Sequence, residues 1–305
     1  MDTLADRFKG VFTALITPFK DGAVDFEAYD ALVERQIEAG VAGLVPVGTT
    51  GEAATLSDEE AEALIARTAK LAAGRALILA GAGANDTHKA VEKAKRAEAA
   101  GADALLVVTP YYNKPSQAGL IAHYTAIAEA VSLPIVLYSV PGRCGVEIAP
   151  ETCAALMERC GNIVAIKEAG GDAARVTRLR AACGDRLIVH SGDDGLTLPF
   201  LSLGAVGVTS VVSNVAPREM VAMVKAWHDG DLAKALALHE AIAELTDSMF
   251  IESNPGPVKA ALALSNLAGP EMRLPMVPVS GQTRDRLAGV LSRFGQTAAA
   301  LREMR

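Results

Sequence analysis

Eight short runs rich in β-branched and other apolar residues recur along the chain, and turns and helical patterns separate them. The first run, FTALITP, ends at Pro18, and the last, GVTSVVSN, ends at Asn214. The six runs between them end near Gly48, Gly83, Thr109, Tyr138, Lys167 and Ser191. Successive ends lie about 30 residues apart, which is the length of one strand plus one crossover helix. This repeat predicts an α/β fold, a parallel (β/α)8 TIM barrel.

The segments between the runs carry helix signals. Apolar residues from Phe26 to Ile37 recur at helical spacing, and SDEE at 57–60 is a capping box. Gly40 stands where the first of these helices should stop. An open doubly wound sheet would share most of this alternation, but no run is followed by G-x-G-x-x-G, and GAGAND at 81–86 lacks the third glycine. The pattern therefore favours the closed barrel.

The strand pattern ends after about residue 230. DLAKALALHEAIAELTDSMF, PVKAALALSNLAG and the stretch after Ser280 all predict helices. We therefore divide the chain into a catalytic barrel, residues 1–230, and a C-terminal helical domain, residues 231–305.

Composition and charge narrow the class of function. Half of the residues are hydrophobic and 21% are charged, which suits a globular protein. A net charge of −7 disfavours nucleic-acid and anionic membrane partners. The first residues, MDTLADRFKG, include acids where a secretion signal has basic residues, and VFTALI is too short to span a membrane. From this start of the chain we expect a cytoplasmic protein, and from its charge one that acts on small molecules. The four cysteines and five histidines lack metal-ligand spacing, so we expect no metal site.

Lys167 is an unexpected residue in the run IVAIKEA, because lysine is rarely buried without compensation. Reactive groups of such barrels gather at the C-terminal ends of the strands, and Lys167 alone among the run ends can form an imine. Alternation places Ile163 and Ala165 on the face of Lys167. Glu168 then points to the other face with Val164 and does not neutralise the lysine. Desolvation inside a barrel favours the neutral, nucleophilic amine.

Three further elements end neighbouring runs or follow them. VGTTGE at 47–52 offers backbone N–H groups and two hydroxyls that suit a carboxylate. Tyr138 offers a phenol for proton transfer beside the lysine strand. Arg143 in VPGRCG can bind a second carboxylate. Taken singly, each of the three has an ordinary alternative: a turn, a packing tyrosine and a solvated arginine. The alternative for Lys167 is a lysine whose amine reaches solvent.

Seven motifs follow one another between Gly48 and Pro278, within a match that runs from about Thr13 to Val279: GTTGEAATLS, TPYYNKPSQAG, YSVPGRCG, AIKEAGGD, SGDD, NPGPVK and RLPMVP. Together they resemble the 4-hydroxy-tetrahydrodipicolinate synthase (dihydrodipicolinate synthase) family. This family is one of the pyruvate-dependent class I aldolases, which also include N-acetylneuraminate lyase. The resemblance implies a lyase that joins pyruvate to L-aspartate 4-semialdehyde through a lysine Schiff base, giving 4-hydroxy-tetrahydrodipicolinate for lysine and diaminopimelate biosynthesis. It also implies no external cofactor, because the imine itself is the electron sink.

The resemblance assigns four catalytic residues. Lys167 would attack the keto carbon of pyruvate, and Tyr138 would donate and accept protons. Thr49 and Tyr112 would be its relay partners, with Tyr112 reaching in from a neighbouring subunit. The implied assembly is a homotetramer built as a dimer of dimers.

The resemblance also assigns the substrate-binding residues. Thr50 would hold the pyruvate carboxylate, and the backbone at Thr209 and Gly192 would line the same pocket. Arg143 would bind the carboxylate of the semialdehyde. A lyase for a sialic acid or a 2-keto-3-deoxy sugar acid is the nearest alternative, but a sugar aldehyde would need hydroxyl partners where Arg143 stands. A barrel that only binds keto acids would not need the amine.

The chain departs from the family at two kinds of position. Ser139 stands where asparagine is frequent, and Thr209 where isoleucine is common. In the pocket that binds inhibitory lysine in regulated members, Asn85 and Tyr111 keep the pattern. The replaced positions are Ala53, Asp58 and Ala61, in place of a serine and two histidines, and Lys89, in place of a glutamate. A cation at Lys89 repels an ammonium group, so we expect weak or absent lysine inhibition.

Overall fold

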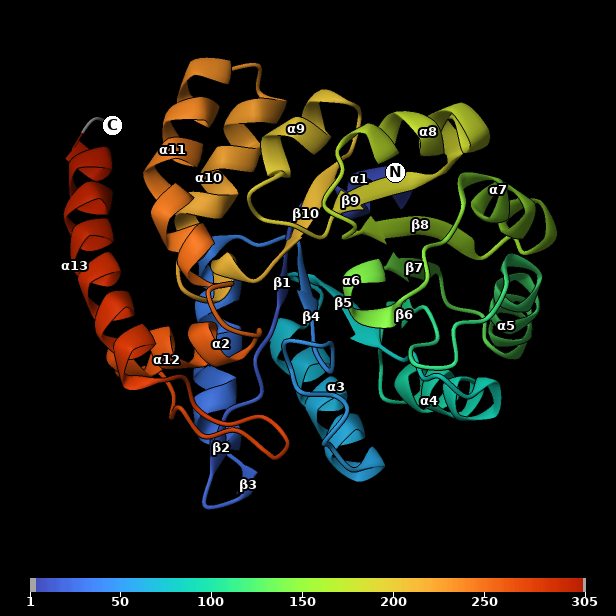
Figure 1. The fold of residues 1–305 in the computed structure, drawn as a ribbon, viewed down its shortest axis with the longest axis horizontal. Coiled ribbons are helices and arrows are strands. Elements are labelled where there is room, and N and C mark those ends of the chain that lie inside the picture. Colours follow the sequence, from blue (N-terminus) through green and yellow to red (C-terminus); the bar gives the residue numbers. More distant parts are fainter. Residues whose placement is uncertain (1–3, 304–305) are drawn as a thin grey trace.

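The computed structural model describes residues 4–303, and within them eight parallel strands close into a barrel (Figure 1). The order around the barrel is β1-β10-β9-β8-β7-β6-β5-β4, with β1 pairing both β4 and β10. The strands are β1 (Gly10–Ala14), β4 (Gly43–Val45), β5 (Leu77–Gly81), β6 (Ala104–Val108), β7 (Ile135–Ser139), β8 (Ile163–Glu168), β9 (Ile188–Ser191) and β10 (Gly207–Ser210). A two-stranded antiparallel ribbon, β2 (Phe19–Lys20) and β3 (Ala23–Val24), lies outside the barrel. The predicted fold class is confirmed.

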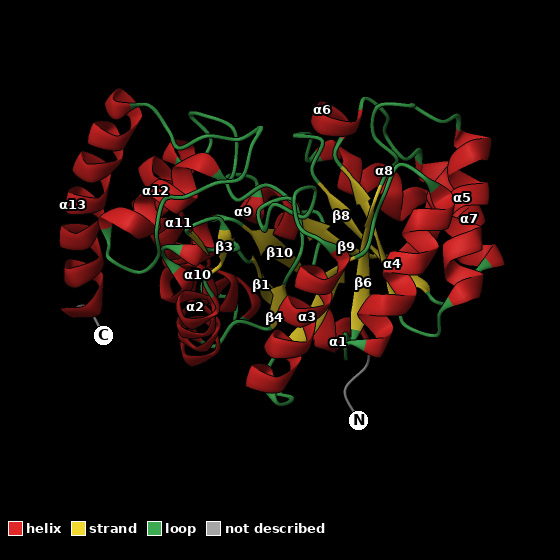
Figure 2. Ribbon diagram, turned by 90° about the horizontal axis from the view of Figure 1, so that it is seen from below, coloured by secondary structure: helices red, strands yellow, loops and turns green. Residues whose placement is uncertain are grey.

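Helices surround the barrel; most cover its outer face, and others lie at its two ends (Figures 1 and 2). They are α1 (Leu4–Phe8), α2 (Phe26–Ala39), α3 (Asp58–Ala72), α4 (Thr87–Ala99), α5 (Gln117–Ala130), α6 (Pro141–Cys144), α7 (Pro150–Arg159), α8 (Ala174–Cys183), α9 (Thr197–Ser202) and α10 (Pro217–His228), with 3-10 turns η1 (Gly184–Arg186) and η2 (Val212–Asn214). The predicted capping box is present, because Ser57 and Glu60 bond reciprocally to each other's backbone N–H. Gly40 ends α2 in the left-handed conformation, also as predicted. None of the helices in residues 4–303 is long and apolar enough to cross a membrane.

Three helices follow the barrel: α11 (Leu232–Ser248), α12 (Gly256–Leu264) and α13 (Gly281–Glu303). Here α11 packs beside α10, and α13 packs against α11 and α12 on the side away from the barrel (Figures 1 and 2). Buried residues of this part, such as Val258 and Leu287, belong to the same hydrophobic cluster as the outer face of the barrel. We keep the division at residues 230 and 231 as a proposal, and the shared core makes the helical part an appendage of the barrel.

Two hydrophobic clusters separate the inside of the barrel from its outside. Alternate residues, such as Leu106 and Val136, fill the interior, whereas their neighbours face the helices. Phe8 of α1 closes the end of the barrel where the strands begin, and Figure 2 shows α6 near the opposite end. The interior is therefore packed below and open only where the strands end.

Strand β8 does not alternate as the sequence predicts. Ile135 pairs with Ile163, but the next residue of β7, Val136, pairs with Ala165, so β8 carries one extra residue in a β-bulge. As a result Ile163 packs in the outer cluster and Val164 against the inner one. The prediction that Ile163 shares the face of Lys167 and that Val164 points away is wrong. Ala165 does face inward, as predicted.

Candidate active site

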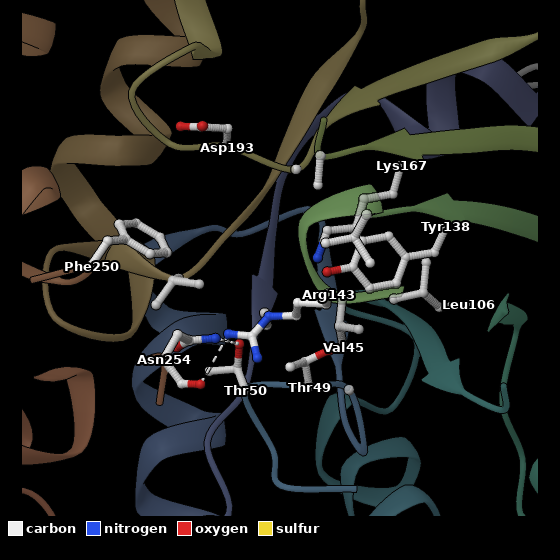
Figure 3. Close-up of a pocket in the computed structure, with 16 residues that line it drawn as sticks. Val45, Thr49, Thr50, Leu106, Tyr138, Arg143, Lys167, Asp193, Phe250 and Asn254 are labelled. Atoms are coloured by element: carbon white, nitrogen blue, oxygen red, sulfur yellow. Dashed lines mark hydrogen bonds between the residues drawn. The ribbon is translucent and has the colours of Figure 1, made fainter. Parts of the chain in front are cut away.

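A cavity of about 200 Å³ opens where the barrel strands end. Its wall comes from the loop after β4, the ends of β7 and β8, helix α6, the loop after β9 and the segment after α11 (Figure 3). The lining residues that carry polar side chains are Thr49, Thr50, Tyr138, Arg143, Lys167, Asp193 and Asn254. This is the position at which parallel barrels hold reactive groups.

Lys167 is buried, with 6% of its surface exposed, and its amine reaches the cavity. Its backbone pairs with Tyr138 on β7, so the two side chains leave neighbouring strands at the same level. The Lys167 Nζ lies 4.2 Å from the centroid of the Tyr138 ring (Figure 3). Lys167 takes part in none of the ion pairs found among residues 4–303. The site thus presents a sheltered amine, not tied to a carboxylate, beside a phenol.

Gly192 allows the chain to pass next to this lysine. A Cβ at position 192 would lie 2.6 Å from the Ala169 Cβ and 3.0 Å from the Lys167 Cε. The Gly192 N–H donates to the Glu168 carbonyl at 2.7 Å, which fixes the strand end that carries the lysine. A side chain at this position would displace Lys167, so the glycine is a steric requirement of the site.

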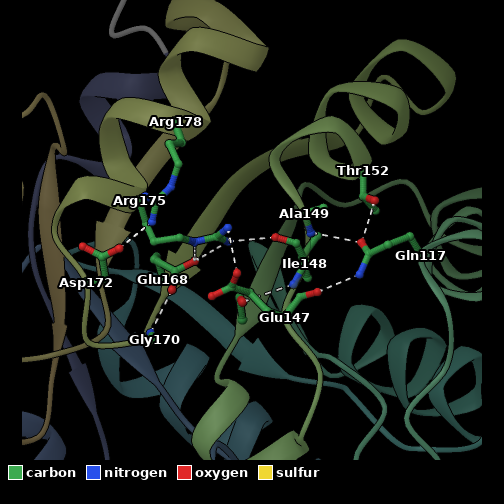
Figure 4. A network of polar contacts seen from close by, with 11 residues as sticks. Gln117, Glu147, Ile148, Ala149, Thr152, Glu168, Gly170, Asp172, Arg175 and Arg178 are labelled. Atoms are coloured by element: carbon green, nitrogen blue, oxygen red, sulfur yellow. Dashed lines mark hydrogen bonds and ion pairs between the residues drawn. The ribbon is translucent and has the colours of Figure 1, made fainter.

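Glu168 points toward Arg175 of α8 and away from the cavity that Lys167 reaches, as predicted. It lies in a buried polar network (Figure 4). Its Oε2 pairs with the Arg175 Nη2 at 3.0 Å, and its Oε1 accepts from the Gly170 N–H at 2.8 Å. Arg175 also donates to the Ile148 carbonyl at 2.7 Å and pairs with Glu147 at 3.0 Å. Burial raises the pKa of the Glu168 carboxyl, and the charge of Arg175 opposes that shift.

This network connects the lysine strand to the segment that carries Arg143. Arg175 is on α8, Glu168 ends β8, and residues 147–149 follow α6. The Gln117 side chain completes the support, since its Oε1 accepts from the Ala149 N–H at 3.0 Å. In the predicted reaction Lys167 and Arg143 act on different substrates. The segments that carry them are both held by the buried Arg175 guanidinium.

The loop after β4 places Thr49 and Thr50 at the cavity. It turns through bonds from the Gly51 N–H to the Gly48 carbonyl and from the Glu52 N–H to the Thr49 carbonyl, both at 3.1 Å. Thr50 is buried, and its Oγ1 accepts from the Asn254 Nδ2 at 3.0 Å. Glu52 adopts a left-handed φ of 54°, which is unusual for a residue with a side chain.

Arg143 stands at the mouth of the cavity on α6. Its Nη2 donates to the Asn254 carbonyl at 3.1 Å, and Figure 3 shows Arg143, Thr50 and Asn254 grouped together. A guanidinium has five N–H donors in all, and at the mouth it can bind an anionic group of an incoming molecule. Asn254 was not predicted individually, although the motif NPGPVK contains it.

Two of the predicted residues lie outside the cavity wall. Thr209 is buried in β10, and its hydroxyl lies 3.2 Å from the His190 Nδ1, while Val211 of the same segment lines the cavity. Tyr112 is 90% exposed on the loop after β6, with a left-handed φ of 75°. A single chain therefore brings together Lys167, Tyr138, Thr49, Thr50, Arg143 and Gly192, without Tyr112 or the Thr209 side chain.

Nearby titratable residues have structural partners. His190 is buried against the Phe8 and Phe12 rings, and burial lowers its pKa to about 4, so the ring is neutral. The buried Asp194 carboxylate accepts from the Val211 N–H at 2.9 Å and from the Ser210 hydroxyl, which fixes the end of β10. The four cysteines are free and buried, and no group of His, Cys, Asp or Glu in residues 4–303 is arranged to hold a metal.

Comparison with known proteins identifies what this architecture resembles. Residues 7–294 match the model of the dihydrodipicolinate synthetase family. The 4-hydroxy-tetrahydrodipicolinate synthase of an Anaeromyxobacter species (strain Fw109-5) is 50% identical over 290 residues, covering 95% of this chain and 98% of the relative. That of Pelobacter propionicus is 47% identical over 288 residues, covering 94% and 99%. The solved structure of the 4-hydroxy-tetrahydrodipicolinate synthase from Methylacidiphilum fumariolicum SolV superposes with a TM-score of 0.95 at 47% identity, covering 97% and 98%.

The Arg175 network yields a stability prediction. In Arg175→Met the Glu168 carboxylate loses its buried counter-charge, and we expect the free energy of unfolding to fall by about 3–5 kcal/mol. Arg178→Met is the matched control, because Arg178 pairs with Asp172 at the surface, where such pairs contribute less than about 1 kcal/mol. Urea unfolding of both variants measures the two losses, and equal losses would contradict a special role for the buried pair.

The loss of unfolding free energy in Arg175→Met should depend on pH. A carboxyl whose folded pKa is raised disfavours the folded state as the pH rises through that pKa, and removal of Arg175 raises the pKa of Glu168 further. The difference from wild type should therefore be largest at neutral pH and shrink as the pH falls toward the pKa of a free glutamate, about 4.3. A difference that is constant over this range would show that Glu168 does not cause it.

Proposed function

Because this chain belongs to the dihydrodipicolinate synthetase family, we propose that it condenses pyruvate with L-aspartate 4-semialdehyde through a Schiff base on Lys167. The product is 4-hydroxy-tetrahydrodipicolinate, a precursor in diaminopimelate and lysine biosynthesis. The enzyme is a lyase of the class I aldolase type. The observation that carries the assignment of the site is the buried Lys167 amine beside Tyr138 in the cavity.

The reaction begins with attack of the Lys167 Nζ on the keto carbon of pyruvate. The C–N bond forms, the keto oxygen takes up protons and leaves as water, and an iminium remains. Tyr138, which lines the cavity beside Lys167, moves these protons, and Thr49 on the same wall is its relay partner. Thr50 holds the pyruvate carboxylate, together with the backbone at Gly192 and the β10 segment that contains Thr209.

The iminium makes the pyruvate methyl group acidic, because its nitrogen accepts the electron pair left by the departing proton. The enamine carbon then bonds to the aldehyde carbon of the semialdehyde, whose oxygen takes a proton. The amino group of the semialdehyde next attacks the former keto carbon and releases the Lys167 amine. These reaction steps require no external cofactor, since the lysine nitrogen is the electron sink.

Arg143 supports the choice of aldehyde. L-Aspartate 4-semialdehyde ends in a carboxylate, which pairs with a guanidinium at the cavity mouth. A lyase for N-acetylneuraminate or a 2-keto-3-deoxy sugar acid is not favoured, since the relatives are synthases of the first kind and a sugar chain would need hydroxyl partners at this point.

Tyr112 supports an assembled enzyme. Its exposed phenol lies on a loop at the mouth end of the barrel and is not part of the cavity wall of its own chain. We propose that it enters the site of a neighbouring subunit and completes the proton relay with Tyr138 and Thr49. The assembly we propose is a homotetramer built as a dimer of dimers, located in the cytoplasm.

Imine formation is the first test. Wild-type protein incubated with pyruvate and borohydride should gain the mass of one reduced pyruvate adduct, located on the peptide that contains Lys167. Lys167→Ala should gain no mass, while its fold, followed by circular dichroism, is retained. An unmodified wild type, or an equal adduct on the variant, would refute the role of Lys167.

Arg143→Met tests the aldehyde site. Loss of a charge-assisted contact to the semialdehyde carboxylate should raise the KM for this substrate by about 10–100-fold, because such contacts contribute about 1.5–3 kcal/mol. Borohydride trapping of pyruvate should persist, since imine formation does not involve the aldehyde. The control is Arg178→Met at the surface. A wild type that turns over sugar aldehydes faster than the semialdehyde would support the alternative function instead.

Feedback by L-lysine should be weak or absent. Lys89 is exposed near the start of α4, and its cation repels the ammonium group of the inhibitor where family members carry an acid. Steady-state assays with increasing L-lysine measure the effect, and Lys89→Glu should increase it. Half-inhibition of the wild type at sub-millimolar L-lysine would contradict this expectation.

A further inference from the structure

A buried ion pair joins the loop after β4 to the C-terminal helices. Lys259 of α12 is fully buried, and its Nζ lies 2.5 Å from the Glu52 Oε1. The other oxygen of Glu52 accepts from the Arg273 backbone N–H at 3.1 Å. The Lys259 Nζ and the Arg273 guanidinium also lie over the Phe19 ring, 4.3 and 4.4 Å from its centroid. Glu52 is thus fixed by residues more than 200 positions away in the sequence.

Stability alone is a weak explanation for this pair. Taking two charges out of water is costly, and apolar residues of the same volume often stabilise a fold as well. Glu52 is two residues after Thr50 and has a left-handed φ of 54°. A residue with a side chain keeps this conformation only when its surroundings determine it. The pair with Lys259 therefore determines the course of the loop that presents Thr49 and Thr50.

The same C-terminal segment contacts Thr50 directly. The Asn254 Nδ2 donates to the Thr50 Oγ1 at 3.0 Å, and the Asn254 carbonyl accepts from Arg143 at 3.1 Å. A threonine hydroxyl has one hydrogen to donate. Because Asn254 supplies a hydrogen to this oxygen, the Thr50 hydrogen is left for another acceptor, and a carboxylate in the cavity is such an acceptor.

We propose that the segment from Asn254 to Lys259 is a positioning element for pyruvate. Lys259 fixes the loop through Glu52, and Asn254 orients the Thr50 hydroxyl toward the pyruvate carboxylate. The inference rests on the proposed function, in which Thr50 binds that carboxylate. It makes the C-terminal appendage a working part of a site whose lysine is in the barrel.

The test measures pyruvate dependence without the aldehyde. In Lys259→Met and Asn254→Ala, the pyruvate concentration that gives half-maximal borohydride trapping should rise about tenfold or more, because small displacements of a positioning group have effects of this size. The KM for the semialdehyde in Lys259→Met should change less than the KM for pyruvate. Arg293→Met is the matched control. It removes the Glu244–Arg293 pair between α11 and α13 of the same appendage, and this pair is not part of the contacts to the loop after β4.

Lys259→Met leaves Glu52 buried without its cation and can fail to fold. The double variant Glu52→Gln, Lys259→Met removes both charges, and Asn254→Ala leaves the pair intact, so one of these keeps the proposal testable. Folded variants with a lower Tm but a half-saturating pyruvate concentration within about twofold of wild type would overturn it. Absence of trapping in the wild type would refute the proposed function itself, so the two failures are distinguishable.

Discussion

Closure of the parallel barrel is the constraint from which the site follows. Strand β1 pairs with β10 as well as β4, and the two end strands approach so closely that a Cβ on Gly207 would lie 2.1 Å from the Gly10 carbonyl oxygen. Once the ring is closed, the C-terminal ends of all strands face one mouth, and Lys167, the penultimate residue of β8, is enclosed by neighbours. Shelter of the Lys167 amine is therefore a property of the whole ring.

The buried cations of this structure differ in whether they have a carboxylate partner. Arg175 and Lys259 are buried with carboxylate partners. Arg175 ties β8 to Ile148 in the segment after α6, and Lys259 ties α12 to Glu52, 207 positions earlier in the sequence. Lys167, in contrast, has no ion-pair partner among residues 4–303. The paired cations hold the walls of the cavity, and the unpaired amine faces its interior. This division explains how an apolar barrel keeps the amine that we propose as the nucleophile in a defined place.

The sequence predicted what depends on local pattern. The runs gave the strands, and the ends of neighbouring runs placed Lys167 beside Tyr138. The extra residue at Val164 was not predictable, because a β-bulge breaks the alternation on which the prediction relied. The Glu52–Lys259 pair and the Asn254 contacts were also missed, since no spacing rule connects residues about 200 positions apart. The family resemblance identified the motifs that contain these residues, but it did not predict the contacts between them.

The most direct test of the account is a crystal structure of the protein soaked with pyruvate. The account predicts continuous density from the Lys167 Nζ to the former keto carbon, with the carboxylate against Thr50 and the phenol of Tyr138 beside the new bond. Pyruvate bound in the cavity with a free Lys167 amine, or bound elsewhere, would contradict it.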